Sequence, residues 1–329
     1  MDMHTLVESF PAQLEEALRI GKSADLKKAQ DEIRNVYISG LGGSGIGGTI
    51  ISEWAYGHCK VPVTVGKGYF IPESVNRNTL VIISSYSGNT EETYACMEQA
   101  IERHAHIVCV TSGGKVAELA KSRNIDHILI PGGMPPRSCL GYSLTQLVFI
   151  FVKYGLLPPS FIEGLEASAN LLKGEQKAIR EQATEIASTL HGRMPVVYCT
   201  TNFEGVAVRF RQQLNENSKV LCWHHVIPEM NHNELVGWAG GSEEIAVVLF
   251  RDPDEYDRNN MRIAINKDII TRYTPHFLEI TAKGKSIVEK SIYLIHLGDW
   301  ASVALASLRG VDAVEVNVIN FLKGELSKK

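Results

Sequence analysis

Leu80-Val-Ile-Ile-Ser-Ser-Tyr-Ser-Gly-Asn-Thr-Glu-Glu-Thr93 is the stretch that decides the fold of this chain. Residues 80–83 are apolar without alternation, which is typical of a strand covered on both faces of a parallel sheet. Helical spacing follows, with Asn89 and Glu92 placed for a capping box. The apolar positions of this expected helix share one face: Tyr94, Met97, Ala100 and Ile101. A strand, a polar turn and a helix in this order form the repeating unit of an α/β fold.

The turn between strand and helix carries three small hydroxyl side chains, Ser85, Ser87 and Thr90. A helix N-terminus leaves backbone N–H groups unpaired and carries a partial positive charge of roughly +0.5, so it attracts anions. Hydroxyl groups beside it can complete a phosphate cradle. Ser and Thr are also the residues that helix caps prefer. By itself, this stretch does not distinguish a phosphate-binding site from a simple helix cap.

An earlier stretch, residues 36–54, has the same order of strand, glycine-rich turn and helix. Gly43, Gly45 and Gly48 fit G-x-G-x-x-G, a pattern that is weak evidence for dinucleotide binding when it stands alone. A dinucleotide site also expects an acidic residue at the end of the second strand. Residues 62–65 form that strand and Gly-Lys-Gly follows it, so a nucleotide is disfavoured. The glycines still allow a close approach of backbone amides, and Ser44 among them adds a hydroxyl.

Composition places the chain among ordinary globular proteins. It has 329 residues, 44% hydrophobic and 21% charged, with a formal net charge of -4, which gives no indication of nucleic-acid binding. The start has no signal-peptide pattern, and no apolar run reaches the roughly 18 residues of a membrane span. We therefore expect a cytoplasmic protein without membrane association. The six cysteines lie singly in apolar segments and are expected to be reduced, mostly buried thiols.

Alternating strands and helices predict two successive α/β domains with central parallel sheets. The expected domains are residues 1–157 and 191–329, with a helical linker at 158–190. Two amphipathic helices are expected within residues 1–34, the first with Leu14, Ala17, Leu18 and Ile20 on its apolar face and the second with Leu26, Ala29 and Ile33. In the second domain the strands are expected at 195–201, 246–250, 274–279 and 291–296, and the last helices at 299–309 and 317–326.

Two further residues are candidates for chemistry. Arg137 lies in a proline-rich loop, where it is either a surface charge or a clamp for an anion, since guanidinium binds phosphate and oxyanions in a forked geometry. Glu216 lies near the end of an expected helix, where the helix dipole disfavours a negative charge and so favours a proton acceptor. A solvated carboxylate at a helix end would look the same.

Three histidines, His224, His225 and His232, raise the possibility of a metal site. Their spacing fits no zinc pattern and no cysteine or HExxH completes a set, so no metal is predicted. His232 precedes an apolar turn that ends in Trp238, which would hold the imidazole ring in place. It is either an acid/base group or a structural histidine.

Together, several motifs resemble the bifunctional phosphoglucose/phosphomannose isomerases, a branch of the phosphoglucose isomerase superfamily built from two sugar isomerase (SIS) domains. The motifs are Gly42-Gly-Ser-Gly45, Ser84-Ser-Tyr-Ser-Gly-Asn-Thr-Glu-Glu-Thr93, Pro136-Arg137, Asn215-Glu-Asn-Ser-Lys219, Glu229-Met-Asn-His-Asn-Glu234 and Ile319-Asn-Phe-Leu-Lys323. The resemblance runs from about residue 30 to the end, and the motifs around residues 216 and 232 are its narrowest part. It implies two SIS-type αβα sandwich domains.

The resemblance also implies a reaction: interconversion of glucose 6-phosphate and fructose 6-phosphate, extending to mannose 6-phosphate, through a cis-enediol without metal or cofactor. This places the enzyme in glycolysis and gluconeogenesis. The implied phosphate ligands are Gly43, Ser44, Ser85, Ser87 and Thr90.

The resemblance assigns the catalytic roles as well. Glu216 is the implied base, Arg137 stabilises the enediolate, and His232 with Lys323 opens the sugar ring. A homodimer with shared sites is implied, the histidine coming from the neighbouring subunit. In the family, a small hydroxyl residue about seven positions before the lysine is linked to tolerance of both C2 epimers. Val316, which has no hydroxyl, stands there, so the resemblance supports glucose 6-phosphate as a substrate more firmly than mannose 6-phosphate.

Two other functions fit part of the pattern. A phosphosugar sensor would need the phosphate cradle but not Glu216, His232 or Lys323, and Lys323 could also belong to a solvated C-terminal tail. An isomerase of amino sugar phosphates would use the same groups. An assay with fructose 6-phosphate separates these alternatives.

Overall fold

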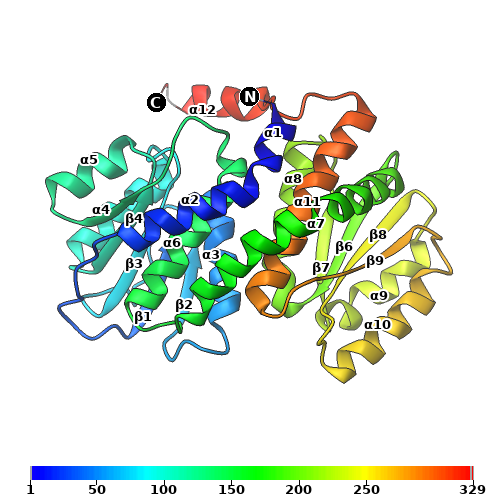
Figure 1. Cartoon of the computed structure of the whole chain (residues 1–329), viewed down its shortest axis with the longest axis horizontal. Helices are drawn as coiled ribbons and strands as arrows, with labels where there is room; N and C mark the ends of the chain where they lie inside the picture. Colours follow the sequence, from blue (N-terminus) through cyan, green and yellow to red (C-terminus); the bar gives the residue numbers. More distant parts are fainter. Residues whose placement is uncertain (1, 327, 329) are drawn as a thin grey trace. The chain divides into compact units, whose positions relative to one another are not determined.

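The computed structural model describes residues 2–326 and 328. The chain forms two compact units, each built on one parallel sheet (Figure 1). The first-sheet unit comprises Ser9–Gly174 and Gly284–Tyr293. The second-sheet unit comprises Glu175–Lys283 with the two ends of the chain, up to Glu8 and from Leu294 onward.

Five parallel strands form the first sheet, in the order β2-β1-β3-β4-β5. Their bounds are β1 (Asn35–Ser39), β2 (Val63–Gly66), β3 (Thr79–Ser84), β4 (His106–Thr111) and β5 (Asp126–Leu129). All six residues of β3 are buried, as expected of a central strand without alternation.

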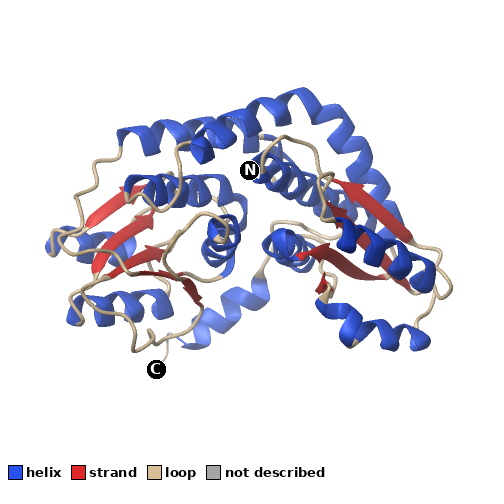
Figure 2. Cartoon of the chain, turned by 90° about the horizontal axis from the view of Figure 1, so that it is seen from below, coloured by secondary structure: helices blue, strands red, loops and turns tan. Residues whose placement is uncertain are grey.

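Helices cover both faces of this sheet (Figure 2). On one face α4 (Glu91–Glu102) and α5 (Gly114–Ser122) pack Met97 and Val116 against Val81. On the other face α3 (Gly42–Ala55) lies against α6 (Leu140–Lys153), which also contacts α2 (Phe10–Ser23). The sheet is thus the middle layer of an αβα sandwich.

Two local expectations for this unit are wrong. Residues 24–34 do not form the second expected helix. Lys27 donates hydrogen bonds from its backbone N–H to Asp126 Oδ2 at 2.6 Å and from its ammonium to Asn124 O at 2.7 Å, and these bonds hold the segment in a non-helical conformation. The capping box is also absent. Thr90 is the N-cap of α4, and Asn89 Oδ1 accepts a hydrogen bond from Lys115 N at 3.1 Å instead.

The second sheet has four parallel strands in the order β7-β6-β8-β9. Their bounds are β6 (Met194–Thr200), β7 (Trp223–Ile227), β8 (Ile245–Arg251) and β9 (Phe277–Thr281). The order repeats that of the first four strands of the first sheet. The strand, turn and helix of residues 36–54 recur at residues 195–217, and this internal repeat extends to the whole sheets.

The other helices are α1 (Met3–Glu8), α7 (Ser160–Leu190), α8 (Glu204–Glu216), α9 (Glu234–Gly237), α10 (Asp257–Ile270), α11 (Ile287–Arg309) and α12 (Asn317–Leu326). Residues 158–190, expected as a linker, consist mainly of the single helix α7. Its first half belongs to the first-sheet unit and its second half to the second-sheet unit. The six cysteines, all within the described residues, are thiols and form no disulfide, as expected.

The expected strand at 291–296 is wrong, because these residues belong to α11. These residues are at most 1% exposed, so α11 is buried on all sides along this stretch, whose middle residues 292–295 are all apolar. Periodicity cannot separate such a helix from a buried strand. By length and composition α11 could span a membrane, but 83% of its apolar window is buried inside the protein, as in a core helix.

His296 is a fully buried histidine within α11, and its Nε2 accepts a hydrogen bond from Trp300 Nε1 at 3.2 Å. Burial lowers the pKa of His296 from 6.5 to about 3, and the positive charge of Arg180 acts in the same direction. Below pH 6.5 the unfolded chain binds a proton that the folded chain excludes. Stability is therefore lost as the pH falls from 6.5 towards 3.

Replacing His296 with glutamine, which stays neutral but can still accept from Trp300, is expected to weaken this pH dependence. Between pH 6.5 and 5 the wild type should lose about 2 kcal/mol more unfolding free energy than His296→Gln. Urea unfolding at the two pH values measures the difference. The exposed His191→Gln is the matched control and should lose as much as the wild type. Equal losses in the wild type and His296→Gln would contradict the prediction.

Candidate functional site

The centre of the first sheet is a topological switch point. The chain leaves β1 towards β2 on one side and β3 towards β4 on the other, although β1 and β3 are neighbours. In open α/β sheets, ligands bind outside the carboxyl ends of two such strands, because the loops there diverge. Both expected phosphate-binding segments follow these strands, one at the start of α3 and one at the start of α4.

Gly43 and Ser44 lie in the first turn of α3, which begins at Gly42, and not in a turn before it. Ser44 Oγ accepts a hydrogen bond from Tyr86 N at 3.0 Å, which ties the two segments together. Ser85 Oγ donates to Thr90 Oγ1 at 3.2 Å. The structure therefore brings Ser44, Ser85 and Thr90 together beside two helix N-termini, where a phosphate would be bound.

The loop of residues 85–90 is held rigidly. Ser87 is exposed, and its Oγ accepts from Asn89 N at 3.2 Å. Gly88 has a φ of +68°, and a Cβ there would lie 1.8 Å from Gly113 O, so no other residue fits without moving the backbone. Ser112 Oγ also donates to Tyr86 O at 2.7 Å. These contacts fix the loop against the start of α5.

Arg137 lies in η1 (Pro136–Ser138), a single turn that packs on the start of α3. A Cβ at Gly43 would lie 2.8 Å from Pro136 O and 3.3 Å from Arg137 Cα, so glycine is what permits this approach. Arg137 is 4% exposed, unlike the usual surface arginine. A buried guanidinium beside the cradle suits an anionic ligand. Gly45 serves packing instead, since a Cβ there would lie 2.4 Å from Gly40 O.

Gly43→Ala is expected to push η1 and Arg137 away from α3. The free energy of unfolding should fall by about 1–3 kcal/mol through overpacking. The kcat of the expected isomerase reaction should fall by about 10- to 100-fold, because a shift of about 1 Å in a positioned group has that effect. Thermal unfolding and steady-state assays measure both. Gly57→Ala, whose Cβ would meet nothing within 4 Å, is the control, and equal behaviour of the two variants would contradict the role given to Gly43.

Two anchors of this site were not expected from the sequence. The Tyr86 hydroxyl accepts a hydrogen bond from Met134 N at 3.2 Å, and Gln13 Nε2 donates to Ser138 O at 2.8 Å. Burial raises the pKa of Tyr86, so its hydroxyl stays protonated. Both residues position the loop that carries Arg137. The sequence contains one signal for the role of Gln13, because this polar residue interrupts the apolar face of α2. In the structure Gln13 is 4% exposed.

In the second-sheet unit, Glu216 is the last residue of α8 and is half-buried. The Lys219 ammonium donates to the backbone carbonyls of Glu216 at 2.5 Å and of Glu315 at 2.7 Å. It thereby ties the end of α8 to the segment that leads into α12. Lys323 is exposed on α12, about 9 Å of helix beyond Asn317. The structure thus brings the segment that precedes α12 to the end of α8.

His232 is exposed at the end of η3 (Glu229–His232), which follows the carboxyl end of β7. Glu216 precedes the amino end of β7, because α8 runs back along the sheet. The five residues of β7 separate the two positions by roughly 15 Å. Within this unit the structure does not bring Glu216 and His232 together.

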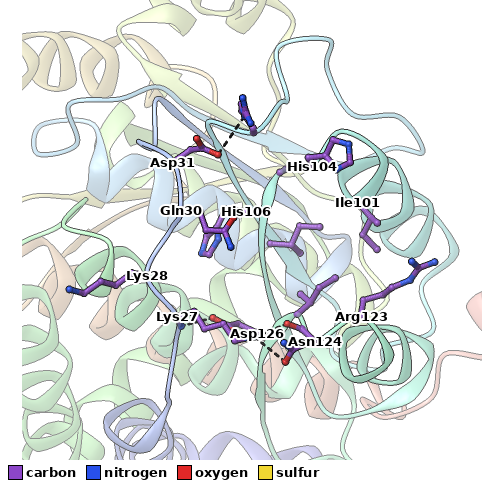
Figure 3. A pocket seen from close by; sticks show the side chains of 14 residues that line it. Lys27, Lys28, Gln30, Asp31, Ile101, His104, His106, Arg123, Asn124 and Asp126 are labelled. Atoms are coloured by element: carbon purple, nitrogen blue, oxygen red, sulfur yellow. Dashed lines mark hydrogen bonds and ion pairs between the residues drawn. The ribbon is translucent and has the colours of Figure 1, made fainter.

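A cavity of about 410 Å³ lies at the opposite, amino-terminal edge of the first sheet, beside His106 and Asp126, the first residues of β4 and β5 (Figure 3). The Lys27 ammonium on its wall is engaged by Asn124 and, at 3.3 Å, by Asp126. The helices α4 and α5 end at this edge, and helix C-termini repel anions. This cavity lies away from the hydroxyl-rich segments at the carboxyl ends of β1 and β3.

Comparison with known proteins shows the family to which the chain belongs. Residues 179–326 match the family described as "Bacterial phospho-glucose isomerase C-terminal SIS domain". The bifunctional phosphoglucose/phosphomannose isomerase of Caldicellulosiruptor bescii is 35% identical over 99% of both chains. That of Thermoplasma acidophilum is 36% identical over 93% of this chain and 97% of the relative.

The fold is similar to that of the C-terminal domain of glucosamine-fructose-6-phosphate aminotransferase from Francisella tularensis. The TM-score is 0.79 at 14% identity, and the match covers 95% of this chain and 98% of that structure. The expected SIS-type αβα architecture with parallel sheets is confirmed. With relatives above 30% identity over nearly its whole length, the chain belongs to the bifunctional phosphoglucose/phosphomannose isomerase family and is an isomerase.

Proposed function

We propose that the protein interconverts glucose 6-phosphate and fructose 6-phosphate, and mannose 6-phosphate more slowly, through a cis-enediol intermediate. One observation carries the proposal. At the switch point of the first sheet, buried hydroxyl groups, two helix N-termini and the buried Arg137 lie together. Such a site suits a phosphate ester that also develops negative charge elsewhere on the molecule.

The phosphate is assigned to Gly43, Ser44, Ser85, Ser87 and Thr90. Backbone amides and hydroxyl groups bind it without a full positive charge, and the helix N-termini add favourable electrostatics. Arg137, whose backbone lies against Gly43, is assigned to the enediolate oxygen. A fixed cation in a site that excludes water stabilises charge as it develops. Binding energy from the remote phosphate orients the reacting carbons.

Proton transfer is assigned to Glu216. Its carboxylate takes the C2 proton of the aldose and returns it to C1, while a proton passes from the C2 hydroxyl to the C1 oxygen. The cis-enediol lies between the two transfers at carbon, and the ketose is the product. Positioned proton transfer of this kind contributes about 10² to 10⁴ in rate. His232 and Lys323 are assigned to opening the sugar ring, which moves a proton between a ring oxygen and the C1 hydroxyl. No metal or cofactor takes part in these steps.

We propose a homodimer in which His232 acts on the substrate of its partner subunit. Support comes from the topology of the second-sheet unit, which holds Glu216 and His232 at opposite ends of β7. A two-fold dimer gives each site one residue of each kind. The α12 helix, with Phe321 69% exposed and no buried residue, offers apolar surface that association can cover. We place the enzyme in the cytoplasm, within glycolysis and gluconeogenesis.

A coupled assay tests the function: purified protein is given fructose 6-phosphate, and glucose 6-phosphate is detected with an NADP-dependent dehydrogenase. Turnover is expected, and it should persist after EDTA treatment and dialysis. Mannose 6-phosphate should react more slowly, because Val316 replaces a hydroxyl residue. Binding of fructose 6-phosphate without turnover would instead indicate a sensor. Turnover confined to glucosamine 6-phosphate would indicate an amino sugar isomerase.

A further inference from the structure

The contact between α8 and α11 combines the apolar packing of Phe210 on Gly298 with a row of polar side chains. Arg209, Gln213 and Asn217 follow one another at four-residue spacing, so they share one face of α8 and its C-cap. Each is at most 2% exposed. A helix face buried to this degree normally carries apolar residues. The composition of this face therefore points to a role beyond core formation.

Each of these side chains bonds to α11. The Asp299 carboxylate accepts from Arg209 Nη2 at 2.8 Å and from Gln213 Nε2 at 2.9 Å. Ser302 Oγ accepts from Asn217 Nδ2 at 3.0 Å and donates to Asp299 O at 2.7 Å. We call these five residues the α8–α11 polar cluster.

Further bonds continue past the end of α8. Ser218 Oγ donates to Ser302 O at 2.6 Å, and Arg309 Nε donates to Ser218 O at 2.9 Å. Glu216 stands between Gln213, one turn before it, and Asn217 and Ser218, directly after it. The residues on both sides of Glu216 are therefore fixed to α11 by buried hydrogen bonds.

Stability alone does not account for the α8–α11 polar cluster. Burial raises the pKa of the Asp299 carboxyl, while Arg209 and Gln213 act in the opposite direction, so desolvation offsets the attraction within the pair. Buried ion pairs can often be replaced by apolar residues of similar size without loss of stability. Hydrogen bonds, however, are directional and fix both the rotation and the axial position of a helix, whereas apolar contacts tolerate sliding.

We infer that Asp299 and Ser302 are positioning residues for Glu216: through Arg209, Gln213 and Asn217 they fix the last turn of α8, and with it the carboxylate that moves the proton. The inference rests on the proposed role of Glu216 as the base. Asp299 and Ser302 act through α8 and not by touching the substrate. A shift of about 1 Å in Glu216 would lower the rate by up to about 100-fold.

The principal test removes the charges without leaving any of them unpaired. In the triple variant Arg209→Met, Gln213→Leu and Asp299→Leu, the Tm should stay within about 4 °C of the wild type. The kcat should fall about 10- to 100-fold, with KM unchanged within about twofold because the phosphate cradle lies elsewhere. The primary isotope effect with glucose 6-phosphate deuterated at C2 should rise, because proton transfer becomes the slow step. A merely structural role would leave the isotope effect unchanged.

Ser302→Ala is the second variant, since it removes one hydroxyl and leaves both charges paired. Its kcat should fall about 5- to 20-fold with unchanged KM. Ser168→Ala is the matched control, because Ser168 is a fully buried serine whose hydroxyl donates to Gly164 O of its own helix at 2.6 Å. Its kcat should stay within about twofold of the wild type.

The outcomes separate this inference from the proposed function. If Glu216→Gln retains the wild-type rate, the proposed base is wrong. If Glu216→Gln is inactive while the folded triple variant has wild-type kcat and isotope effect, only the positioning inference is wrong. If the triple variant does not fold, Ser302→Ala decides, and a wild-type kcat in that variant overturns the inference.

Discussion

Glu216→Gln is expected to lower kcat for fructose 6-phosphate by about 10³- to 10⁴-fold. Glutamine has nearly the size of glutamate and keeps an acceptor oxygen, but it cannot take a proton at neutral pH. KM should stay within about twofold, because the groups assigned to the phosphate lie on the first sheet. The coupled assay measures both constants.

A second measurement isolates the proton step. In deuterated water the wild-type enzyme should exchange the C2 proton of glucose 6-phosphate, and Glu216→Gln should not. Glu204→Gln is the matched control, since it neutralises an exposed glutamate at the other end of the same helix. Retention of exchange by Glu216→Gln would show that another group removes the proton.

Mixing two inactive variants is expected to restore activity. Glu216→Gln and His232→Ala each disable both sites of a homodimer. In a mixed dimer, one site combines the two defective residues and the other combines the two intact ones, if His232 acts on the partner's substrate. Random pairing makes about half of the dimers mixed, so the mixture should reach about one quarter of wild-type activity.

The experiment requires that subunits exchange, which joint refolding or coexpression achieves. Glu216→Gln paired with Glu216→Ala is the control and should stay inactive under any arrangement. Absence of recovery in the test mixture would mean that Glu216 and His232 of one chain serve one site. The β7 strand, which separates the two positions by roughly 15 Å, is the structural reason to expect recovery.

The sequence predicted the sheets well and some helices poorly, for a physical reason. A central parallel strand such as β3 is buried on both faces, and a short apolar run between polar turns is typical of such a strand. The run at 291–296 looked the same but belongs to the part of α11 that is buried on every side. Burial removes the periodicity on which the distinction depends.

Within the candidate site, the sequence predicted the chemical type of the functional groups but not the contacts that hold them in place. The hydroxyl groups at residues 85–90 can be recognised in the sequence as candidate phosphate ligands, because several Ser and Thr residues lie together directly after a strand. That Gly43 makes room for η1 depends on a contact between residues more than 90 positions apart. The anchoring by Tyr86 and by Asp299 likewise depends on tertiary partners, which single-sequence patterns do not contain.

The repeated strand order has a consequence for stoichiometry. The position after β6 that corresponds to the glycine-rich start of α3 is filled by Phe203, which is fully buried, and by Glu204 in the first turn of α8. The Glu255 carboxylate also faces this end of the sheet, where Thr200 Oγ1 donates to it at 2.6 Å. A bulky ring and two negative charges exclude a phosphate there. Although the chain contains the same architecture twice, we expect titration to find one sugar phosphate bound per polypeptide.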